Sequence, residues 1–498
     1  MSENRFNLVD EKWIPVANKG LQSLNDIFSG KSLTALGGNP VQKLSIIKLL
    51  LAITQSAWTP YNDQEWISCG IEEMNSKVIT YLMEHKNEFW LYGTKPFLQI
   101  PAVEKAEIKS YGTLLSHVAS GNTTVLTQIQ QEIELTDSDK ALLVVQMMGF
   151  SMGGKKTDNS VVLSKEYNGK SNDKGKPSTS KAGPSLGFLG YLHNYIIGKS
   201  IAETIWLNLF TSHDIQSFAS FPEGLGDAPW KNMPSGENCE VAIKLKRSYL
   251  GRLVPLSRFM LLKAEGVHYT EGIYHEDYKA GISDTSIAVD YSCKIPKAIW
   301  VDTEKKPWRQ LPALLSFIES ESLSSFECPQ LRICIKRANA NRLHFGIYSG
   351  GIRVSSNAGE QYLSGSDDYV ESEIFFDTTV LGQTWFANFK KELTDMENIS
   401  SILYKSVLSY FKTLQTDGKN IAKKATNTYW QLCERKIISI VNVCNDEIVG
   451  ERLKPIKRTL LNYVLKSYDT YCPHDTARQI EAWAKNRPRL GKYFDDIK

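Results

Sequence analysis

Apolar residues recur at helical spacing through the last quarter of the chain. Residues three or four positions apart lie on one face of an α-helix, so each such stripe predicts an amphipathic helix. Four stripes follow residue 380, joined by short polar segments, and we assign their members to packing rather than to a cofactor site. They comprise Trp385, Phe389, Leu393 and Met396; Ile399, Leu403, Val407, Phe411 and Leu414; Trp430, Cys433, Ile437, Val441 and Cys444; and Leu453, Ile456, Leu460, Val464 and Tyr468. The pattern predicts an antiparallel four-helix bundle over residues 371–498.

The region before this bundle mixes strand and helix signals. Residues 6–16 combine β-forming and turn residues, and Pro15 limits them to an edge strand or a strand end. Asn39, Pro40 and Gln42 are the residue types of a helix N-cap, a first helical position and a capping box, which predicts a buried helix to about Ala57. From about 187 to 365, β-type runs such as 298–301 and 331–335 alternate with Gly-rich turns. We therefore expect an α+β protein whose residues 1–370 form a large mixed α/β domain.

The composition is that of a folded chain with more than one core. It has 498 residues, 42% hydrophobic and 23% charged, close to the average for soluble globular proteins. The longest apolar run, residues 44–53, contains Lys48 and is far shorter than the roughly 20 residues that span a bilayer. No secretory signal opens the sequence, so we expect a cytoplasmic protein without a membrane partner. The eight scattered cysteines lack a C-x-x-C pair, which predicts reduced, mostly buried thiols.

Basic charge is unevenly distributed along the chain. The formal net charge is only +3, too small to indicate a polyanionic partner by itself. Residues 452–498 nevertheless hold eleven Lys or Arg against five acids, and residues 154–186 hold seven Lys against three acids among many Gly, Ser and Asn. The second segment is either a flexible surface loop or a loop that contacts nucleic acid, and the first is either a solvated helix face or a phosphate-binding surface.

No catalytic motif stands out. The sequence lacks G-x-x-x-x-G-K-[ST], G-x-S-x-G and H-E-x-x-H patterns. His213-Asp214 and His474-Asp475 are His-Asp dipeptides such as metal-dependent phosphohydrolases carry, but no further set of His and Asp ligands accompanies them. His268 and His275 flank an acidic, aromatic stretch that either binds a cation or, as we favour, forms an exposed polar loop.

Two Gly-rich segments suit contact with a nucleic acid. Residues 149–156 place small residues and two lysines together after an apolar segment. Residues 349–359 form a second Gly-bounded tip, with Arg353 and several hydrogen-bonding side chains. Glycine has no side chain, so its backbone can enter the narrow minor groove of DNA. Lysines or arginines beside it can neutralise the phosphates. Each segment alone is also compatible with an ordinary turn.

Four stretches of the chain match the motifs of a known family. They are FNLVDEKWIPV at residues 6–16, GGNPVQKLSIIKLLLAI at 37–53, KPFLQIP at 95–101 and SGNTTVL at 120–126. With the C-terminal helical region, they resemble the CasA family, the large subunit of the type I-E CRISPR RNA-guided surveillance complex Cascade. The resemblance implies a non-catalytic protein, without metal or cofactor, that sits at the 5′ end of the guide RNA. It also implies reading of the protospacer-adjacent motif, duplex opening and a docking surface for a helicase-nuclease. The implied partners are guide RNA, target double-stranded DNA, other Cascade subunits and that helicase-nuclease.

The resemblance assigns roles to particular positions. It implies a loop that anchors to the guide and the backbone subunits at Gly121, Asn122, Thr123, Thr124, Val125 and Leu126. It implies minor-groove reading by a glycine loop, a lysine finger and a wedge at a hairpin tip, matched here by Ser151, Met152, Gly153, Gly154, Lys155, Lys279, Arg353, Ser356 and Asn357. For the lysine finger, Lys279 is the cation of that region, whereas strict spacing gives Asp277. Because the minor groove mainly separates A·T from G·C, we expect a tolerant motif. Because Asn357 stands where the best-known pattern has Gln, we also expect a motif that differs from the better-known one. Basic residues of the bundle either hold a DNA strand or only solvate its surface: Lys423, Lys424, Arg452, Lys457 and Arg458.

Two other functions stay open on the sequence alone. A metal-dependent nuclease or phosphohydrolase would use His213, Asp214, His474 or Asp475 as ligands. A structural scaffold would bind other proteins and touch DNA only non-specifically.

Overall fold

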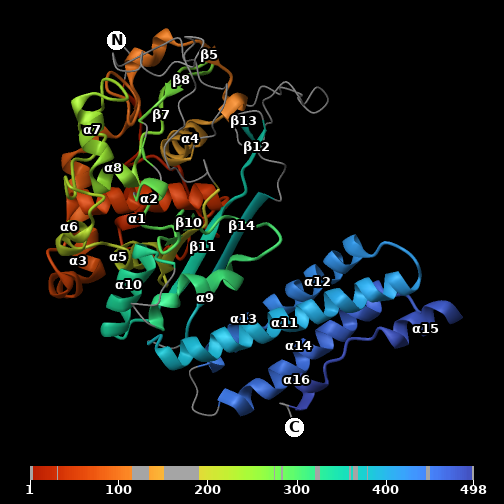
Figure 1. Ribbon diagram of the computed structural model, residues 1–498. Coiled ribbons are helices and arrows are strands. Elements are labelled where there is room, and N and C mark those ends of the chain that lie inside the picture. The colour runs from red at the N-terminus through yellow and green to blue at the C-terminus, as the bar shows by residue number, and fades with distance from the viewer. Residues whose placement is uncertain are drawn as a thin grey trace. The chain divides into compact units, whose positions relative to one another are not determined.

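The computed structural model describes residues 4–30, 32–114, 134–150, 190–273, 275–276, 278–281, 284–319, 326–357, 360–362, 368–377, 380–444 and 449–495. The chain divides into two compact units. Unit 1 comprises residues 1–308, 325–341 and 345–373, and unit 2 comprises residues 309–324, 342–344 and 374–498. The predicted fold class is confirmed, because unit 1 combines helices with small sheets and the C-terminal region is helical (Figure 1).

Unit 1 contains several small sheets rather than one large one. In the described residues, two of them have three strands, in the orders β14-β11-β6 and β5-β8-β7, and the others are two-stranded. The strands are β1 Arg5–Asn7, β2 Ile14–Val16, β3 Gly20–Gln22, β4 Trp90–Tyr92, β5 Ile108–Lys109, β6 His193–Ile197, β7 Arg258–Leu262, β8 Val267–Glu271, β9 Val289–Asp290, β10 Lys297–Ala298, β11 Gly346–Ile352, β12 Ser355–Asn357, β13 Glu360–Tyr362 and β14 Tyr369–Phe375. The helices that cover them are α1 Leu24–Phe28, α2 Pro40–Ala57, α3 Asp63–Glu84, α4 Asp137–Gly149, α5 Ile201–Leu207, α6 Ser212–Ser217, α7 Glu240–Lys246, α8 Tyr249–Leu253 and α10 Pro329–Ala340, with short 3₁₀ turns that include η2 Pro101–Lys105 and η5 Tyr278–Ala280.

Helix α2, red in Figure 1, runs through the core of unit 1. It begins as predicted: Asn39 accepts from the backbone of Gln42, the Gln42 side chain accepts from Asn39, and Pro40 occupies the first helical position. Packing against α3, α4, α5, α8 and β11 buries most of its surface. Lys48 is buried with the rest of the helix and forms an ion pair with Asp284. An unpaired buried ammonium would be costly, so this pair explains how a lysine is tolerated inside the longest apolar run.

The two most specific family motifs build this core. Trp13 of the first motif is buried, and its indole donates to the carbonyl oxygen of Leu8. In KPFLQIP, the buried Gln99 donates to the carbonyl oxygen of Leu91 and accepts from the backbone of Leu262, which ties three segments together. A buried amide needs such partners, and these motifs therefore serve the fold.

Unit 2 is helical over most of its described length. It holds α9 Leu311–Leu314, α11 Gln383–Thr413, α12 Lys419–Glu434, α13 Ile437–Val443, α14 Val449–Tyr471, α15 Ala477–Lys485 and α16 Gly491–Asp495. Helices α11, α12 and α14 pack on one another, with α13 and α15 against them. The first two predicted helices are a single one, α11, because the residues between Met396 and Ile399 contain neither Gly nor Pro. The third stripe spans the end of α12 and all of α13.

Two local predictions were wrong. Residues 331–335 lie in helix α10 and not in a strand, because Pro329 starts the helix and Leu331 and Ile335, four residues apart, share its buried face. The first part of segment 349–359 is the buried strand β11, and no exposed tip begins before residue 353. Glycine is required in β11 for close packing, since a Cβ on Gly351 would lie 2.6 Å from the carbonyl oxygen of Tyr191.

The structure bears on two expectations from the sequence, the state of the cysteines and the length of the apolar helices. All eight cysteines are free, and Cys328, Cys334, Cys433, Cys444 and Cys472 are buried. Among the described helices, none combines the length and the apolar character needed to cross a bilayer.

Candidate nucleic-acid interface

Helix α4 leads directly into the predicted glycine loop. A capping box between Thr136 and Asp139 starts the helix, and it ends at Gly149, where the Phe150 backbone donates to the carbonyl oxygen of Gln146. The predicted loop residues Ser151, Met152, Gly153, Gly154 and Lys155 lie outside the described residues. Their starting point is fixed, because Phe150 is buried and the backbone of Ser257 donates to the carbonyl oxygen of Met148 over 3.0 Å.

Segment 255–257 connects this helix end to the residues before η5. Ile273 donates to the carbonyl oxygen of Leu256 (2.9 Å), and Gly272 donates to that of Ser257 (3.2 Å). Glycine is needed at 272, because a Cβ there would lie 2.6 Å from the backbone nitrogen of Arg258. The approach of the two backbones therefore connects the end of α4 to residues 272–273, which precede η5 in the chain.

The expectation of an exposed polar loop between His268 and His275 was wrong. His275 is buried, and its Nε2 donates to the carbonyl oxygen of Pro255 over 2.7 Å. Burial, together with the charge of the adjacent Arg252, lowers the pKa of His275 well below its usual value, so the imidazole stays neutral.

Glu271, an acidic residue between these two histidines, forms an ion pair within the protein. Glu271 pairs with Arg258 over 3.0 Å, and both side chains are buried. His268 Nδ1 lies 2.7 Å from the carbonyl oxygen of Ala106. The Arg258–Glu271 pair therefore helps to hold strands β7 and β8 together.

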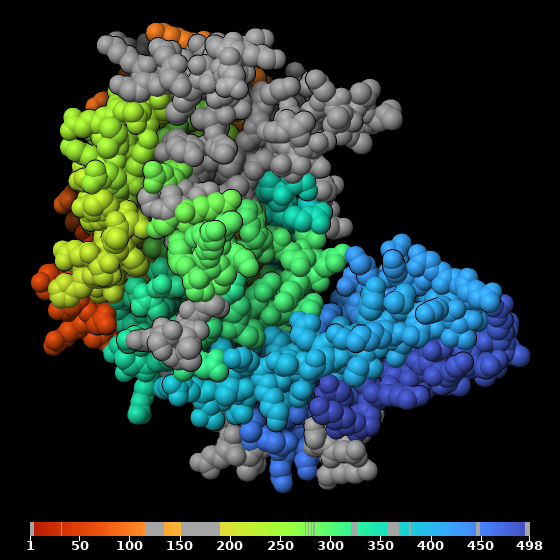
Figure 2. Space-filling model, viewed as in Figure 1, coloured from red at the N-terminus to blue at the C-terminus, as the bar shows by residue number. Residues whose placement is uncertain are grey.

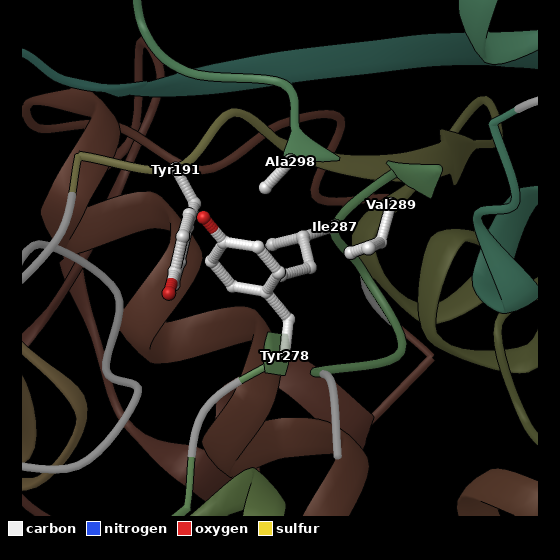
Figure 3. Packing of buried hydrophobic residues seen from close by; sticks show 5 residues of the cluster. All are labelled: Tyr191, Tyr278, Ile287, Val289 and Ala298. Carbon is white, nitrogen blue, oxygen red and sulfur yellow. The ribbon is translucent and has the colours of Figure 1, made fainter. Parts of the chain in front are cut away.

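Turn η5 carries the predicted lysine finger and is supported by aromatic packing of the preceding residue. Lys279 is exposed, whereas the preceding Tyr278 is buried. The Tyr278 ring meets Tyr191 edge to face, with ring centroids 5.7 Å apart, and Figure 3 shows it among Ile287, Val289 and Ala298. Such apolar packing fixes the chain next to Lys279.

The ring contacts of Tyr191 continue towards the predicted wedge. Trp300 packs against Tyr191, with centroids 5.3 Å apart. Gly190 lies between Trp300 and the chain that enters β12, since a Cβ on Gly190 would be 3.9 Å from Trp300 Cε3 and 3.3 Å from the backbone nitrogen of Val354. Tyr278, Tyr191 and Trp300 therefore link η5 to the base of the β12–β13 hairpin.

Arg353 stands at the base of this hairpin in a fixed orientation. Its backbone donates to the carbonyl oxygen of Asp368 (2.8 Å), its Nε donates to Asp368 Oδ1 (3.1 Å), and its Nη1 donates to the Thr303 hydroxyl (3.2 Å). Asp368 is buried and the guanidinium is partly exposed. An arginine held on one side by a buried carboxylate keeps donors for an incoming phosphate or base edge.

The predicted wedge residues lie on strand β12. β12 and β13 are antiparallel, with Ser356 opposite Gln361 and Asn357 opposite Glu360. Asn357 is the last residue of β12. The structure therefore brings together four parts of the predicted motif-reading set in unit 1: the end of α4, η5 with Lys279, Arg353 and the hairpin strand with Ser356 and Asn357.

The other predicted site residues are separate from this group. The anchoring loop, Gly121, Asn122, Thr123, Thr124, Val125 and Leu126, lies outside the described residues. In unit 2, exposed cations lie on two packed helices, Lys423 and Lys424 on α12 and Arg452 and Arg458 on α14.

Lys457 differs from these cations. Its ammonium lies 2.9 Å from Glu392 Oε1, and the Glu392 side chain is only 7% exposed. Burial raises the pKa of Glu392 although Lys457 opposes this, so the lysine is needed to stabilise a carboxylate inside unit 2. Its charge is already matched within the protein.

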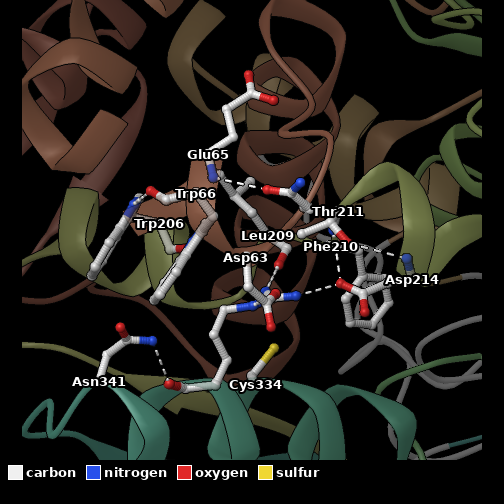
Figure 4. Close-up of polar contacts among 12 residues, drawn as sticks. Asp63, Glu65, Trp66, Trp206, Leu209, Phe210, Thr211, Asp214, Cys334 and Asn341 are labelled. Atoms are coloured by element: carbon white, nitrogen blue, oxygen red, sulfur yellow. Dashed lines mark hydrogen bonds and ion pairs between the residues drawn. The ribbon is translucent and has the colours of Figure 1, made fainter. Parts of the chain in front are cut away.

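The His-Asp dipeptides have structural partners. Asp214 forms the capping box of α6 with Thr211, and it also pairs with the buried Arg337 (Figure 4). Arg337 donates as well to Asp63 Oδ1 and to the carbonyl oxygen of Leu209, both over 2.6 Å. Asp214 therefore serves to fix α6 and α10 together.

The histidines of these dipeptides are engaged with aromatic rings. His213 contacts Tyr61 edge to face, and His474 stacks on Trp483. Within the described ranges, no group of three or more His, Cys, Asp or Glu side chains is placed to hold a metal ion.

Comparisons with known proteins agree with this architecture. A family model described as CRISPR-associated protein Cse1 matches residues 7–467. A curated relative, CRISPR-associated protein CasA/Cse1 of Thermus thermophilus, is 28% identical over 170 residues, a match that covers 31% of this chain and only about a third (33%) of the relative.

Solved structures share the fold over nearly the whole chain. Thermobifida fusca Cse1 superposes with a TM-score of 0.76 at 16% identity, covering 99% of each chain. Thermus thermophilus CasA superposes with a TM-score of 0.72 at 16% identity and the same coverage. A chain in a structure described as a CRISPR RNA-guided surveillance complex gives 0.67 at 14% identity, covering 98% of this chain and 99% of that one. The match of the family model over most of the sequence shows that the chain belongs to the Cse1 (CasA) family, the large subunits of type I-E Cascade.

Proposed function

We propose that this chain is the non-catalytic large subunit of a CRISPR RNA-guided surveillance complex. In this role it recognises the protospacer-adjacent motif in double-stranded DNA through the minor groove, promotes duplex opening and R-loop formation, and recruits a helicase-nuclease. Its partners are the guide RNA, the target DNA, the other Cascade subunits and that enzyme. Family membership supports assembly into such a complex, as does the shared fold with a chain in a solved surveillance complex.

One observation carries the DNA-reading part of the proposal. Three segments far apart in sequence lead to Phe150, to Lys279 and to the stretch with Arg353 and Asn357. Backbone hydrogen bonds connect the end of α4 to residues 256–257 and 272–273, and the Tyr278–Tyr191–Trp300 contacts connect η5 to the segment before the hairpin. Backbone and cations on a fixed support suit a rigid duplex, because a preorganised surface loses little conformational entropy on binding.

The chemistry of these segments favours the minor groove. Gly153 and Gly154 bring backbone without side chains, which suits a groove only about 6 Å wide. Lys279 and Arg353 supply positive charge, while Ser356 and Asn357 supply hydrogen-bonding groups at the end of β12. Since that groove presents a degenerate pattern, a set of related motifs is the expected target.

The helical unit supplies a second, sequence-independent contact. Lys423, Lys424, Arg452 and Arg458 are exposed on α12 and α14, and cations in such positions bind phosphates in a salt-dependent way. We propose that they hold one strand of the opened duplex. Lys457, which is paired with Glu392, contributes mainly to stability.

The test compares guide-loaded complexes with and without this subunit on duplexes randomised beside one target. A short motif should be enriched only when the subunit is present, and replacing Gly153 and Gly154 together by Leu should abolish the enrichment. Gly491→Leu is the matched control, because a Cβ there meets no atom within 4 Å. Equal binding with and without the subunit would reject motif reading. Divalent-ion-dependent DNA cleavage that disappears in His474→Ala would reject the non-catalytic role in favour of a nuclease.

A further inference from the structure

Trp300 is unusual among the tryptophans of this chain. All eleven tryptophans lie in the described part of the chain, and only Trp300 belongs to the exposed residues, with 44% of its surface accessible. Tryptophan is highly buried on average, because its large ring gains free energy on leaving water. An exposed indole that its own chain leaves uncovered is therefore a candidate contact for a partner.

The indole is held in a fixed position. The backbone of Val301 donates to the carbonyl oxygen of Gly190 (2.8 Å), and Leu192 donates to that of Ile299 (3.1 Å), so Trp300 is clamped against the segment at 190–192. The Tyr191 ring supports the indole at an interplanar angle of 47°. The segment that holds Trp300 belongs to the green part of the chain in Figure 2.

The surroundings of Trp300 indicate what would cover it. Thr303, three residues further on, accepts from Arg353, so the segment that carries the indole also contacts a guanidinium at the base of the β12–β13 hairpin. Lys297, three residues before, is also exposed. Single-stranded nucleic acid is bound by surfaces that combine an aromatic ring, on which a base stacks, with cations that bind the phosphates, and this segment carries or contacts both kinds of group.

A paired duplex does not satisfy this site. In a duplex both faces of each base are already stacked on neighbouring bases, so an indole gains a partner only when a nucleotide leaves the stack. Such nucleotides arise beside the recognised motif as the duplex opens, next to the hairpin that holds Asn357.

We propose that Trp300 is a stacking platform for an unpaired nucleobase released when the target duplex opens, with Arg353 binding its phosphate. This inference rests on the proposed function, and it adds a residue and a ligand class to it. Trp300 acts after motif binding, because its ligand does not exist until the first base pair separates.

The expected effect follows from the free energy of stacking. A base stacked on an aromatic side chain contributes enough that removing the ring lowers the opening equilibrium by about 5- to 150-fold. Trp300→Leu keeps apolar bulk against Tyr191 but removes the π face, whereas Trp300→Phe keeps a smaller ring. Tyr61→Leu is the matched control, because Tyr61 is an aromatic residue with 58% exposure in the loop before α3.

The experiment uses guide-loaded complexes containing the full-length subunit. Duplexes carry 2-aminopurine at each of the first positions beside the motif, on one strand at a time, and its fluorescence reports unpairing and stacking. Wild type should show a position that unpairs yet stays quenched, Trp300→Phe should retain part of that quenching, and Trp300→Leu should lose it and open less. Tyr61→Leu should match wild type.

Three results would overturn the inference, and they separate it from the proposed function. If Trp300→Leu opens and quenches like wild type while motif discrimination persists, the stacking role is wrong and motif reading stands. If wild type itself shows no motif discrimination, the proposed function fails first. If Trp300→Leu prevents the subunit from joining the complex before DNA is added, while its circular dichroism is unchanged, Trp300 is a protein contact and not a base platform.

Discussion

Replacing Arg337 by Met should destabilise unit 1 more than any exposed arginine substitution on the same helix. The Arg337 guanidinium, only 2% exposed, pairs with Asp63 and Asp214 and donates to the carbonyl oxygen of Leu209. These contacts join α10 to the start of α3, to α6 and to the chain between α5 and α6 (Figure 4). Methionine fills similar volume without any donor, so the substitution removes three contacts at once.

The magnitude follows from how exposed each partner is. Asp63 is 65% exposed, so its pair contributes about 0–1 kcal/mol. Asp214 is only 20% exposed, and a buried bond to a charged group contributes about 1.5–3 kcal/mol. Leaving the buried carbonyl of Leu209 without a donor costs about 1–3 kcal/mol. Apolar burial of the methionine offsets part of this loss, and we expect a net destabilisation of about 3 kcal/mol.

Urea unfolding of the purified chain, followed by circular dichroism and by amide hydrogen exchange in α10, measures this loss. Arg332→Met is the control on the same helix, because Arg332 is 35% exposed and pairs with a half-exposed Glu327. That variant should change the free energy of unfolding by less than about 1 kcal/mol. Equal free energies for the two variants would refute the reasoning, since burial would then not distinguish the two arginines.

Three further predictions concern other parts of the chain. Burial lowers the pKa of His275 in the folded chain. Below about pH 6.5 this imidazole is therefore protonated in the unfolded chain but stays neutral in the folded chain. Thermal stability should therefore fall from pH 7 to pH 5, and His275→Gln should flatten this dependence; an unchanged slope would contradict it. Lys423→Gln with Lys424→Gln should lower the salt dependence of DNA binding by the complex by about one unit of slope per lysine. Lys457→Gln should leave that slope unchanged but reduce urea stability, since it leaves Glu392 unpaired. Gly272→Ala should cost about 1–3 kcal/mol of unfolding free energy, because its Cβ collides with the adjacent backbone; wild-type stability would contradict this.

Local signals in the sequence were reliable where one short segment determines the outcome. The N-terminus of α2 depends only on Asn39, Pro40 and Gln42, and the structure contains the capping box that these residues predict. The apolar stripes of unit 2 likewise identified its helical character, because amphipathic spacing reflects one buried face. Their division into helices failed at residues 397–398, where nothing in the sequence breaks the helix.

Signals that depend on tertiary packing were misread. Gly350 and Gly351 suggested a turn, but they lie in a central strand where neighbouring segments leave no room for a Cβ. Similarly, the polar residues between His268 and His275 suggested solvent exposure, because the sequence does not show that Glu271 has a buried arginine opposite it on β7. Pairing across strands is a non-local property, and it decides whether a charged residue can be buried.

The candidate interface shows the same limit. Lys279, Arg353 and Asn357 were predicted as separate site residues. The fold connects the segments that carry them through the contacts of Tyr278, Tyr191 and Trp300. Trp300 was missed because it stands in a β-type run, where a tryptophan normally marks a core position. Its exposure depends on Gly190 and Tyr191, more than a hundred residues earlier in the chain. An isolated tryptophan close to lysines was the available signal, and such a pattern is too common to identify a site alone.

The pairing of buried charges bears on the competing enzymatic function. A hydrolytic metal site needs carboxylates whose negative charge is left for a cation, since hard divalent ions bind through such oxygens. Four buried or half-buried carboxylates of the described chain are instead matched by a lysine or an arginine: Asp284 by Lys48, Asp214 by Arg337, Glu271 by Arg258 and Glu392 by Lys457. A divalent cation would have to displace the bonded cation from each, at a cost of several kcal/mol for the charge left buried. These carboxylates therefore stabilise the two units, whereas the lysines and arginines proposed to bind phosphates include exposed ones in each unit: Lys279 and Arg353 in unit 1, and Lys423, Lys424, Arg452 and Arg458 in unit 2.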